Sequence, residues 1–396
     1  MMPIRTSQKA AQFNESVIRE MTRLFLTHSG PEGVNLAQGF PDFPAPDALK
    51  EAACAAIRAD LNQYAITWGA KSLREAIADK TAHHYGVRPD PEREITVACG
   101  ATEAMMAALL ALTNPGDEVI VFEPFYENYG PDAVLSGATP RFVRLHAPDW
   151  RLDPAELAAV FNNKTRAIIV NTPHNPTGKV FAAEELGWIA ALCQKWDVVA
   201  ITDEIYEHLV YEGKHLRLSD LPGMAERTVT ITGLSKTYSA TGWRIGWLLA
   251  PPEATVAIRR VHDFLTVGAA APLQEGAATA LRFPDTYYAE LATRYQEKRD
   301  SFLAVLRSVG LTATTPPGAY YVLADASVWL KTLKLPDDKA LARWLVTERD
   351  IAVVPGSSFF RVPAEGANLI RFCYCKKPET LERAAKLLTA LFPGVA

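Results

Sequence analysis

Residues 198–206 read VVAITDEIY, and residues 228–236 read TVTITGLSK. Each stretch is a short apolar run that gives way to polar residues, with Asp203 closing the first run and Lys236 following the second. Apolar runs of this length, bounded by turn residues, are typical of strands buried on both faces of a parallel sheet. Three similar runs occur earlier in the chain, ITVA at 95–98, EVIVF at 118–122 and AIIV at 167–170.

Helix-like segments lie between these strand-like runs. Residues 102–112 (TEAMMAALLAL) and 183–195 (AEELGWIAALCQK) are two of them. Alternating strands and helices predict an α/β fold, in which helices cover a mostly parallel sheet. After Pro284 the pattern changes to a long helix, three strand-like segments and a last helix, at 286–309, 319–325, 351–354, 368–375 and 378–391. This part of the chain predicts a smaller α+β unit.

The composition narrows the classes of protein to which the chain can belong. Its 396 residues are 48% hydrophobic and 22% charged, which excludes a disordered or collagen-like chain. The 41 basic and 45 acidic residues give a net charge of −4, so there is no basic surplus to bind nucleic acid. The five cysteines lack zinc-site and redox spacing, and we expect no metal site. Because no run of 18 apolar residues and no signal-like N-terminus occur, we expect a cytoplasmic protein without a membrane segment.

Polar residues and glycines follow the predicted strands, and this is where ligands bind in open parallel sheets. Gly100, Ala101 and Thr102 follow strand 95–98 and open a helix, so their backbone N–H groups and the helix dipole would attract a phosphate. Arg244, eight residues after Lys236, would add a bidentate cation. The alternative for Thr102 is a simple helix cap.

Lys236 and Asp203 add two groups with opposite requirements. A lysine at the end of a buried strand is desolvated, which favours its neutral and nucleophilic form, whereas an ordinary lysine is solvated. A carboxylate at the end of an apolar run needs a cationic partner, and a helix cap or an internal ion pair is the alternative explanation. A phosphate site, an imine-forming lysine and a buried aspartate together are what pyridoxal phosphate chemistry requires.

Residues 235–246, SKTYSATGWRIG, resemble the lysine segment of class I/II aminotransferases of fold type I. Four further matches occur in the order found in that family, QGFPD at 38–42, NPTGK at 175–179, DEIY at 203–206 and IRF at 370–372. Together the matches span nearly the whole chain. The segments 38–46 (QGFPDFPAP) and 264–274 (FLTVGAAAPLQ) are most similar to the branch of kynurenine, glutamine and methionine aminotransferases.

The resemblance implies roles for four residues at the centre of the site. Lys236 would form the Schiff base with pyridoxal phosphate and then carry a proton between Cα of the amino acid and C4′ of the cofactor. Asp203 would keep the pyridine nitrogen protonated. Asn175 and Tyr206 would hydrogen-bond the 3′-oxygen of the cofactor.

The resemblance also implies how the rest of the cofactor is held. Tyr126 would stack on the ring. Phe125, one residue away, is the other candidate for this role, and packing in the core is the alternative for either side chain. Tyr64 would reach the phosphate of the neighbouring subunit, so we expect a homodimer with shared active sites. Within one subunit the phosphate would bind to Gly100, Ala101, Thr102 and Arg244.

Arg371 would bind the α-carboxylate of the substrate through two parallel N–H···O contacts. Asn175 and the backbone of Gly39 would assist it. A surface arginine is the alternative, but the apolar neighbours Ile370 and Phe372 argue against free solvation.

Two features depart from the pattern of relatives. Many relatives have a serine three residues before the lysine, where this chain has Gly233, and Ser235 is the candidate to replace the lost phosphate contact. The N-terminal segment has Ile18 and Leu24 where some relatives use an aromatic residue. Donor preference is therefore expected to come from the surroundings of Ile18, Trp68 and segment 264–274.

These observations predict a fold-type-I, pyridoxal-phosphate-dependent aminotransferase with a large domain at 46–283 and a small domain formed by 1–45 and 284–396. It would move the amino group of an aromatic, methionine, glutamine or kynurenine-like L-amino acid to a 2-oxo acid by a ping-pong mechanism. The alternatives are an aspartate-type aminotransferase, a C–S β-lyase of the same fold, and a non-catalytic ligand-binding module.

Overall fold

The computed structural model describes residues 4–13 and 15–391, so both ends of the predicted small domain lie outside the described residues. The helices are α1 (Val17–His28), α2 (Asp47–Arg58), α3 (Lys71–Tyr85), α4 (Ala101–Leu112), α5 (Tyr129–Ser136), α6 (Pro154–Val160), α7 (Ala183–Trp196), α8 (Leu234–Thr237), α9 (Pro252–Leu265), α10 (Ala271–Ala280), α11 (Asp285–Ser308), α12 (Ser327–Leu333), α13 (Asp338–Arg349) and α14 (Pro378–Thr389). In this described part of the chain, no helix is both long and apolar enough to cross a membrane.

The strands belong to three sheets. They are β1 (Val34–Asn35), β2 (Ile95–Ala98), β3 (Glu118–Glu123), β4 (Thr139–His146), β5 (Arg151–Leu152), β6 (Thr165–Asn171), β7 (Val199–Asp203), β8 (Thr228–Gly233), β9 (Gly246–Leu249), β10 (Tyr321–Asp325), β11 (Ile351–Ala352), β12 (Val354–Pro355) and β13 (Leu369–Cys373). The five strands predicted in the first 240 residues are all present, whereas β4 and β9 were not predicted.

The largest sheet has eight strands in the order β2-β9-β8-β7-β6-β3-β4-β5. Strands β8, β7, β6, β3 and β4 pair in parallel with one another. β9 runs antiparallel to β2 and β8, and β5 runs antiparallel to β4. The predicted α/β fold with a mostly parallel sheet is confirmed.

Side chains of the central strands alternate between two hydrophobic cores. Val121 and Ile169 face one core, to which α4, α5 and α9 contribute. Ile120 and Ile168, their chain neighbours, face the other core together with α7. Because both faces of the sheet are buried, these strands are continuous apolar runs rather than alternating ones.

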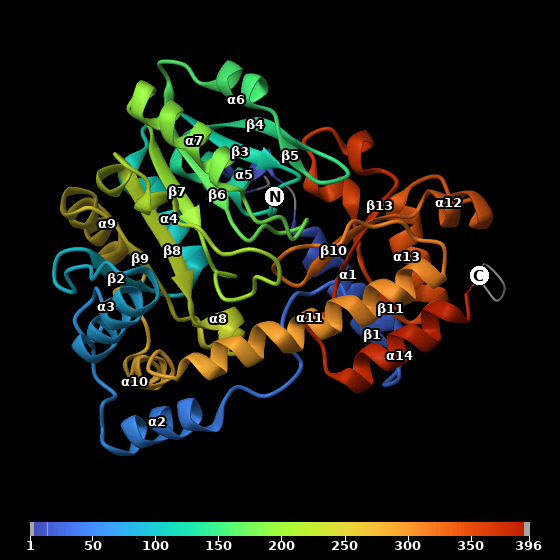
Figure 1. The fold of residues 1–396 in the computed structure, drawn as a ribbon, viewed down its shortest axis with the longest axis horizontal. Coiled ribbons are helices and arrows are strands. Elements are labelled where there is room, and N and C mark those ends of the chain that lie inside the picture. Colours follow the sequence, from blue (N-terminus) through green and yellow to red (C-terminus); the bar gives the residue numbers. More distant parts are fainter. Residues whose placement is uncertain (1–3, 14, 392–396) are drawn as a thin grey trace.

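The C-terminal part of the chain forms a smaller α+β unit around a three-stranded antiparallel sheet, β10-β13-β12. Helix α11, the long orange helix in Figure 1, extends from α10 to α14, which lies beside β1. β1 pairs in parallel with β11, so the segment before α2 lies against C-terminal elements. The domain boundary near residues 283–284 stays a prediction.

Strand register brings the predicted site residues to one edge of the large sheet. Asn171 of β6 pairs with Asp203 of β7, and Asp203 pairs with Ile231 of β8. Lys236 follows β8 on the one-turn helix α8. The ends of three neighbouring strands therefore present their polar residues side by side.

Candidate active site

A cavity of about 520 Å³ lies at the carboxyl ends of these strands. Of the twelve site residues proposed from the sequence, it is lined by Gly39, Ala101, Thr102, Tyr126, Asn175, Asp203, Tyr206, Lys236, Arg244 and Arg371. A larger groove of about 680 Å³ between α11 and α14 contains none of them. The structure thus brings residues of the eight-stranded sheet, the three-stranded sheet and the N-terminal segment together around one cavity.

Lys236 is a partly buried lysine on the cavity wall. Its Nζ donates to the backbone oxygen of Gly39 at 3.0 Å. Burial lowers the pKa of Lys236 to about 8, and the positive charges of Arg244 and Arg371 lower it as well, while Asp203 acts in the opposite direction. The neutral amine is therefore accessible near physiological pH.

Asp203 ends β7 and is 8% exposed. Its Oδ2 accepts a hydrogen bond from the Tyr129 hydroxyl at 2.8 Å, and its Oδ1 accepts one from the Ile205 N–H at 3.3 Å. Burial raises the pKa of Asp203 to about 6, although both hydrogen bonds lower it. Among residues 4–13 and 15–391 no cationic side chain forms an ion pair with this carboxylate, so it is available to a cationic ligand.

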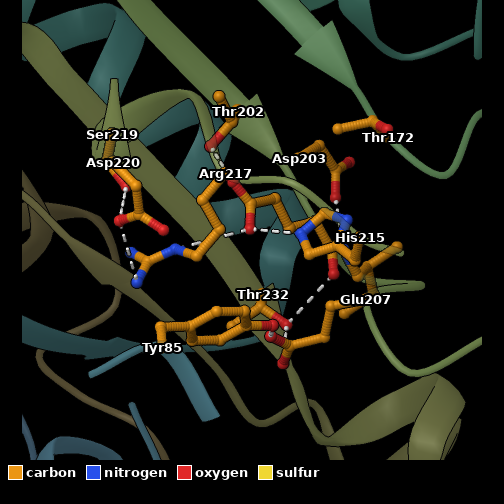
Figure 2. Close-up of polar contacts among 12 residues, drawn as sticks. Tyr85, Thr172, Thr202, Asp203, Glu207, His215, Arg217, Ser219, Asp220 and Thr232 are labelled. Carbon is orange, nitrogen blue, oxygen red and sulfur yellow. Dashed lines mark hydrogen bonds and ion pairs between the residues drawn. The ribbon is translucent and has the colours of Figure 1, made fainter. Parts of the chain in front are cut away.

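A buried polar network fixes the chain immediately after Asp203 (Figure 2). The carboxylate of Glu204, 1% exposed, accepts hydrogen bonds from Thr202 at 2.8 Å and from His215 at 2.7 Å. Arg217 lies 3.8 Å from the same carboxylate. These partners hold the Glu204 side chain and, with it, the backbone that carries Asp203.

Glu207 anchors the other end of the same turn. It accepts from Lys80 at 2.7 Å, from Tyr85 at 2.5 Å and from Thr232 at 3.2 Å. Although burial raises the pKa of Glu207, Lys80 and the other donors hold it well below its ordinary value. The turn between Asp203 and Glu207 is therefore secured by charged pairs that the sequence pattern did not reveal.

Asn175 and Tyr206 line the cavity with Asp203, and each is held by hydrogen bonds. The Asn175 N–H donates to Oδ1 of Asn171 at 2.8 Å, and Nδ2 of Asn171 donates to the backbone oxygen of Asp203 at 2.9 Å. The Tyr206 and Tyr321 hydroxyls lie 3.0 Å apart. Asn175 is thus linked to the end of β7 through Asn171, whereas Tyr206 is held by Tyr321.

The N-terminus of α4 and Arg244 form the opposite end of the cavity. Gly100 is the residue before α4 and has φ +84°, a conformation that favours glycine. A Cβ built on Gly100 would lie 2.4 Å from a terminal nitrogen of Arg244, so only glycine allows this approach. Because the cap position is Gly100, the interpretation of Thr102 as a helix cap is wrong. Free N–H groups and a guanidinium together form a site suited to a phosphate.

Close packing of two strands explains why residue 233 is glycine and not the serine that many relatives have at this position. It pairs with Gly246 across β8 and β9, and a Cβ at residue 233 would lie 2.9 Å from the Gly246 Cα. The two glycines therefore allow an approach of backbones that leaves no room for a serine side chain as the strands are placed here. Ser235, the candidate replacement, lines the cavity.

Arg371 is fully buried on β13, so the interpretation as a surface arginine is wrong. Its Nη1 donates to Oδ1 of Asn175 at 3.0 Å, and its Nη2 donates to the backbone oxygen of Ala37 at 2.5 Å. The guanidinium lies 4.5 Å from the centre of the Tyr321 ring, and its Nε is buried without a hydrogen-bond partner in the described part of the chain. The guanidinium therefore keeps its Nε–H, and one N–H on each Nη, for a ligand.

Tyr64 lies outside the cavity of the single chain. So do Trp68 and segment 264–274, which were expected to determine donor preference. Tyr64 is 88% exposed and Phe264 is 94% exposed. Trp68 packs against the Arg259 guanidinium, 4.8 Å from its ring centre, rather than against the cavity. Ile18 lines the cavity. Phe125 packs against Phe142, so of the two candidates for stacking on the ring it is Tyr126 that lines the cavity.

Sequence reasoning missed several residues that line the cavity, including Asn171, Tyr129, Asp132 and Tyr321. Asn171 ends an apolar run in the same way as Asp203, so the rule of polar strand ends would have found it. The other three come from α5 and β10, where no sequence signal indicated a ligand site.

The profile of the family described as "Aminotransferase class I and II" matches residues 31–388. The chain belongs to this family of aminotransferases. It is 39% identical to human kynurenine–oxoglutarate transaminase 1 over 88% of this chain and 90% of that protein. It is 37% identical to methionine aminotransferase of Escherichia coli K12 over 98% of this chain and 99% of that protein. The solved structure of N-succinyldiaminopimelate aminotransferase from Mycobacterium tuberculosis superposes with a TM-score of 0.93, at 37% identity, over 98% of this chain and 100% of that one.

The aminotransferase family assignment confirms the predicted resemblance, its fold type and its enzyme class. The chain is a pyridoxal-phosphate-dependent transaminase of the branch that contains kynurenine and methionine aminotransferases. The roles of individual residues stay predictions.

Proposed function

We propose that this aminotransferase binds pyridoxal phosphate between the N-terminus of α4 and Asp203, and that it takes amino groups from methionine, glutamine, kynurenine and aromatic amino acids. One observation carries the proposal. The guanidinium of Arg244 at a helix N-terminus, a buried carboxylate without an ion pair, a lysine of lowered pKa and the buried guanidinium of Arg371 all line one cavity.

The cavity fits this cofactor at both of its ends. Where Gly100 has no side chain, a phosphate can approach the α4 N–H groups and Arg244 together. Asp203 has no ion-pair partner among the described residues, so its carboxylate is free to bind a protonated pyridine nitrogen. When bound, the cofactor supplies a ring that accepts the electron pair left by a broken Cα–H bond.

Lys236 is suited both to attack an aldehyde and to move a proton. A pKa of about 8 leaves part of the amine neutral near physiological pH, and only the neutral amine is a nucleophile. The same amine would take the proton from Cα of the amino acid and deliver it to C4′ of the cofactor. Gly39 O, 3.0 Å from Nζ, holds the amine in the cavity.

Arg371 and Gly39 are placed to bind the α-carboxylate. The unused Nε–H of Arg371 gives the guanidinium a donor for a carboxylate oxygen. The backbone oxygen of Gly39 accepts hydrogen bonds from Lys236 and from the Tyr320 hydroxyl, whereas the Gly39 N–H would donate to the substrate. A Cβ at residue 39 would lie 2.0 Å from the Tyr321 hydroxyl, so the close approach requires glycine.

Similarity and the cavity wall support the choice of donors. The human and E. coli relatives, similar along most of their lengths, are named for kynurenine and methionine. Ile18 supplies an apolar contact, and apolar pockets separate donors by only about 1–3 kcal/mol for each methylene-sized change. Arg19, a third arginine on the cavity wall, is exposed to water, where it would bind a second carboxylate weakly. Aspartate should therefore be the poorer donor.

The test is kcat/KM of the first half-reaction with methionine, phenylalanine, kynurenine, glutamine and aspartate. We expect the first four donors to lie within a few decades of one another and aspartate to lie below them. Arg19→Ala should change this order little, and Arg23→Ala, on the same helix, is the matched control. A roughly hundredfold lead for aspartate that Arg19→Ala removes would overturn the donor proposal and assign a distal carboxylate to Arg19.

We also propose that the enzyme is a homodimer in which Tyr64 serves the partner's phosphate site. Apolar side chains are exposed around Tyr64 and Phe264, namely Ile57, Leu61, Ile66, Leu265 and Val267. The two segments lie together, because His262 bonds the backbone oxygen of Thr67 at 2.8 Å. Exposed apolar groups gathered in this way are typical of a protein interface. Sedimentation velocity at micromolar concentration should give a dimer, and a monomer would contradict the proposal.

A further inference from the structure

Asp132 is a buried carboxyl group on the cavity wall that the proposed mechanism does not use. It lies in the first turn of α5, is 6% exposed and lines the cavity. Its Oδ2 atom is fully buried and has no hydrogen-bond partner among the described residues. A buried carboxyl oxygen without a partner costs free energy, so an interaction with a ligand would explain why it is there.

The groups around Asp132 place it at the Asp203 end of the cavity. Tyr129, three residues before Asp132 on the same helix, donates to Asp203 at 2.8 Å. The charge of Asp203 acts directly on Asp132, and Tyr126 and Tyr129 lie in the field of both carboxyl groups. Burial raises the pKa of Asp132 to about 7, and Asp203 adds to the rise. No cationic side chain of the described residues forms an ion pair with Asp132.

Two neighbouring carboxyl groups repel each other when both are ionised, and each is stabilised by a cation bound between or beside them. A protonated ring nitrogen at Asp203 is such a cation. The ordinary role of an acidic residue in a first helical turn is to interact with the helix dipole, but an exposed carboxylate does this without the cost of burial. Burial beside Asp203 is the feature that the dipole role leaves unexplained.

We propose that Asp132 is a positioning residue for the cofactor, whose carboxyl group acts through Asp203 to strengthen the binding of the protonated pyridine nitrogen. The proposal rests on the proposed function, because it takes Asp203 as the partner of that nitrogen. It adds a second carboxyl group to the ring-nitrogen end of the site.

The test compares two probes that bind without a covalent bond to Lys236. One is pyridoxamine phosphate, and the other is its analogue in which a C–H replaces the ring nitrogen. At about pH 8, Asp132→Asn should raise the Kd of pyridoxamine phosphate about tenfold, or about 1.4 kcal/mol, and leave the Kd of the carbon analogue unchanged. Asp132→Leu, which removes the charge without adding an amide, should give the same difference between the probes.

Asp203→Asn is the reference variant, and it should weaken the binding of pyridoxamine phosphate more than the binding of the carbon analogue. If Asp203→Asn discriminates between the probes and Asp132→Asn does not, the Asp132 proposal is overturned and the role of Asp203 stands. If neither variant discriminates, both the Asp132 proposal and the proposed cofactor placement fail. Thermal unfolding of the cofactor-free variants completes the test. An unchanged or higher midpoint for Asp132→Asn supports the proposal, whereas a lower midpoint with equal loss of both probes would assign Asp132 to helix stability and overturn it.

Discussion

Replacing Asp203 by asparagine should make the cofactor-free protein more stable at alkaline pH and the enzyme far less active. Burial raises the pKa of Asp203 from its ordinary 3.8 to about 6, against the opposing hydrogen bond from Tyr129. Between these pH values the folded protein keeps a proton that the unfolded chain has lost, so its stability falls as pH rises through this window and is constant above it. A pKa change of about two corresponds to about 3 kcal/mol of unfolding free energy. Asparagine avoids this cost because it carries no charge.

Urea unfolding of the cofactor-free proteins, at one protein concentration, measures this effect. The free energy of unfolding of Asp203→Asn should exceed that of wild type by an amount that grows between about pH 4 and pH 6 and stays at about 3 kcal/mol at higher pH. Asp149→Asn, at an exposed position, is the matched control and should show no such growth. In the loaded enzyme, kcat of Asp203→Asn should fall by several decades, each equal to about 1.4 kcal/mol of barrier.

Two results would refute this reasoning. A wild-type kcat in Asp203→Asn would remove the electron-sink role from the carboxylate. A cofactor-free variant that is less stable than wild type at about pH 8 would mean that the carboxylate is already stabilised within the chain, contrary to the absence of an ion pair to it among the described residues.

Further predictions concern three other residues. Lys236→Ala should still bind pyridoxamine phosphate but lose turnover, and turnover at the wild-type rate would exclude Lys236 from the mechanism. In wild-type protein, imine formation between Lys236 and the aldehyde of pyridoxal phosphate should become faster with rising pH and level off above about pH 8, because only the neutral amine attacks. A rate that still rises towards pH 10 would contradict the lowered pKa of Lys236. Arg371→Lys should raise KM for every donor about ten- to hundredfold, with a smaller change in kcat, because bidentate geometry is lost; an effect on one donor alone would point to side-chain recognition instead. Tyr64→Phe should raise the Kd of pyridoxamine phosphate several-fold, roughly 1 kcal/mol, and an unchanged Kd would separate Tyr64 from the phosphate site.

Much of the fold and of the site could be predicted because buried parallel strands leave a strong local signal. The apolar runs ending at Ala98 and Thr202 coincide with the observed ends of β2 and, within one residue, of β7. The polar residues that follow must then meet at one sheet edge. The burial of Arg371 could be anticipated from its apolar neighbours Ile370 and Phe372, which the structure places in the core.

What could not be predicted depends on contacts between distant parts of the chain. Lys80 and Glu207 are 127 residues apart and become an ion pair only in the fold. The place of Asp132 near Asp203 depends on how the short helix α5 packs, and a helix of eight residues leaves little periodic signal. The proposed second subunit would cover the exposed Tyr64, and a pattern within one chain does not place two chains against each other.

The most direct test of the central claim follows the amino nitrogen itself. The loaded wild-type enzyme is mixed with methionine labelled with nitrogen-15 on its amino group, and after a single turnover a 2-oxo acid is added. The account predicts that the label passes first to pyridoxamine phosphate and then to the new amino acid, with the matching 2-oxo acid of methionine formed in equal amount. Label released as ammonia together with a cleaved carbon–sulfur bond would contradict the account and identify a lyase.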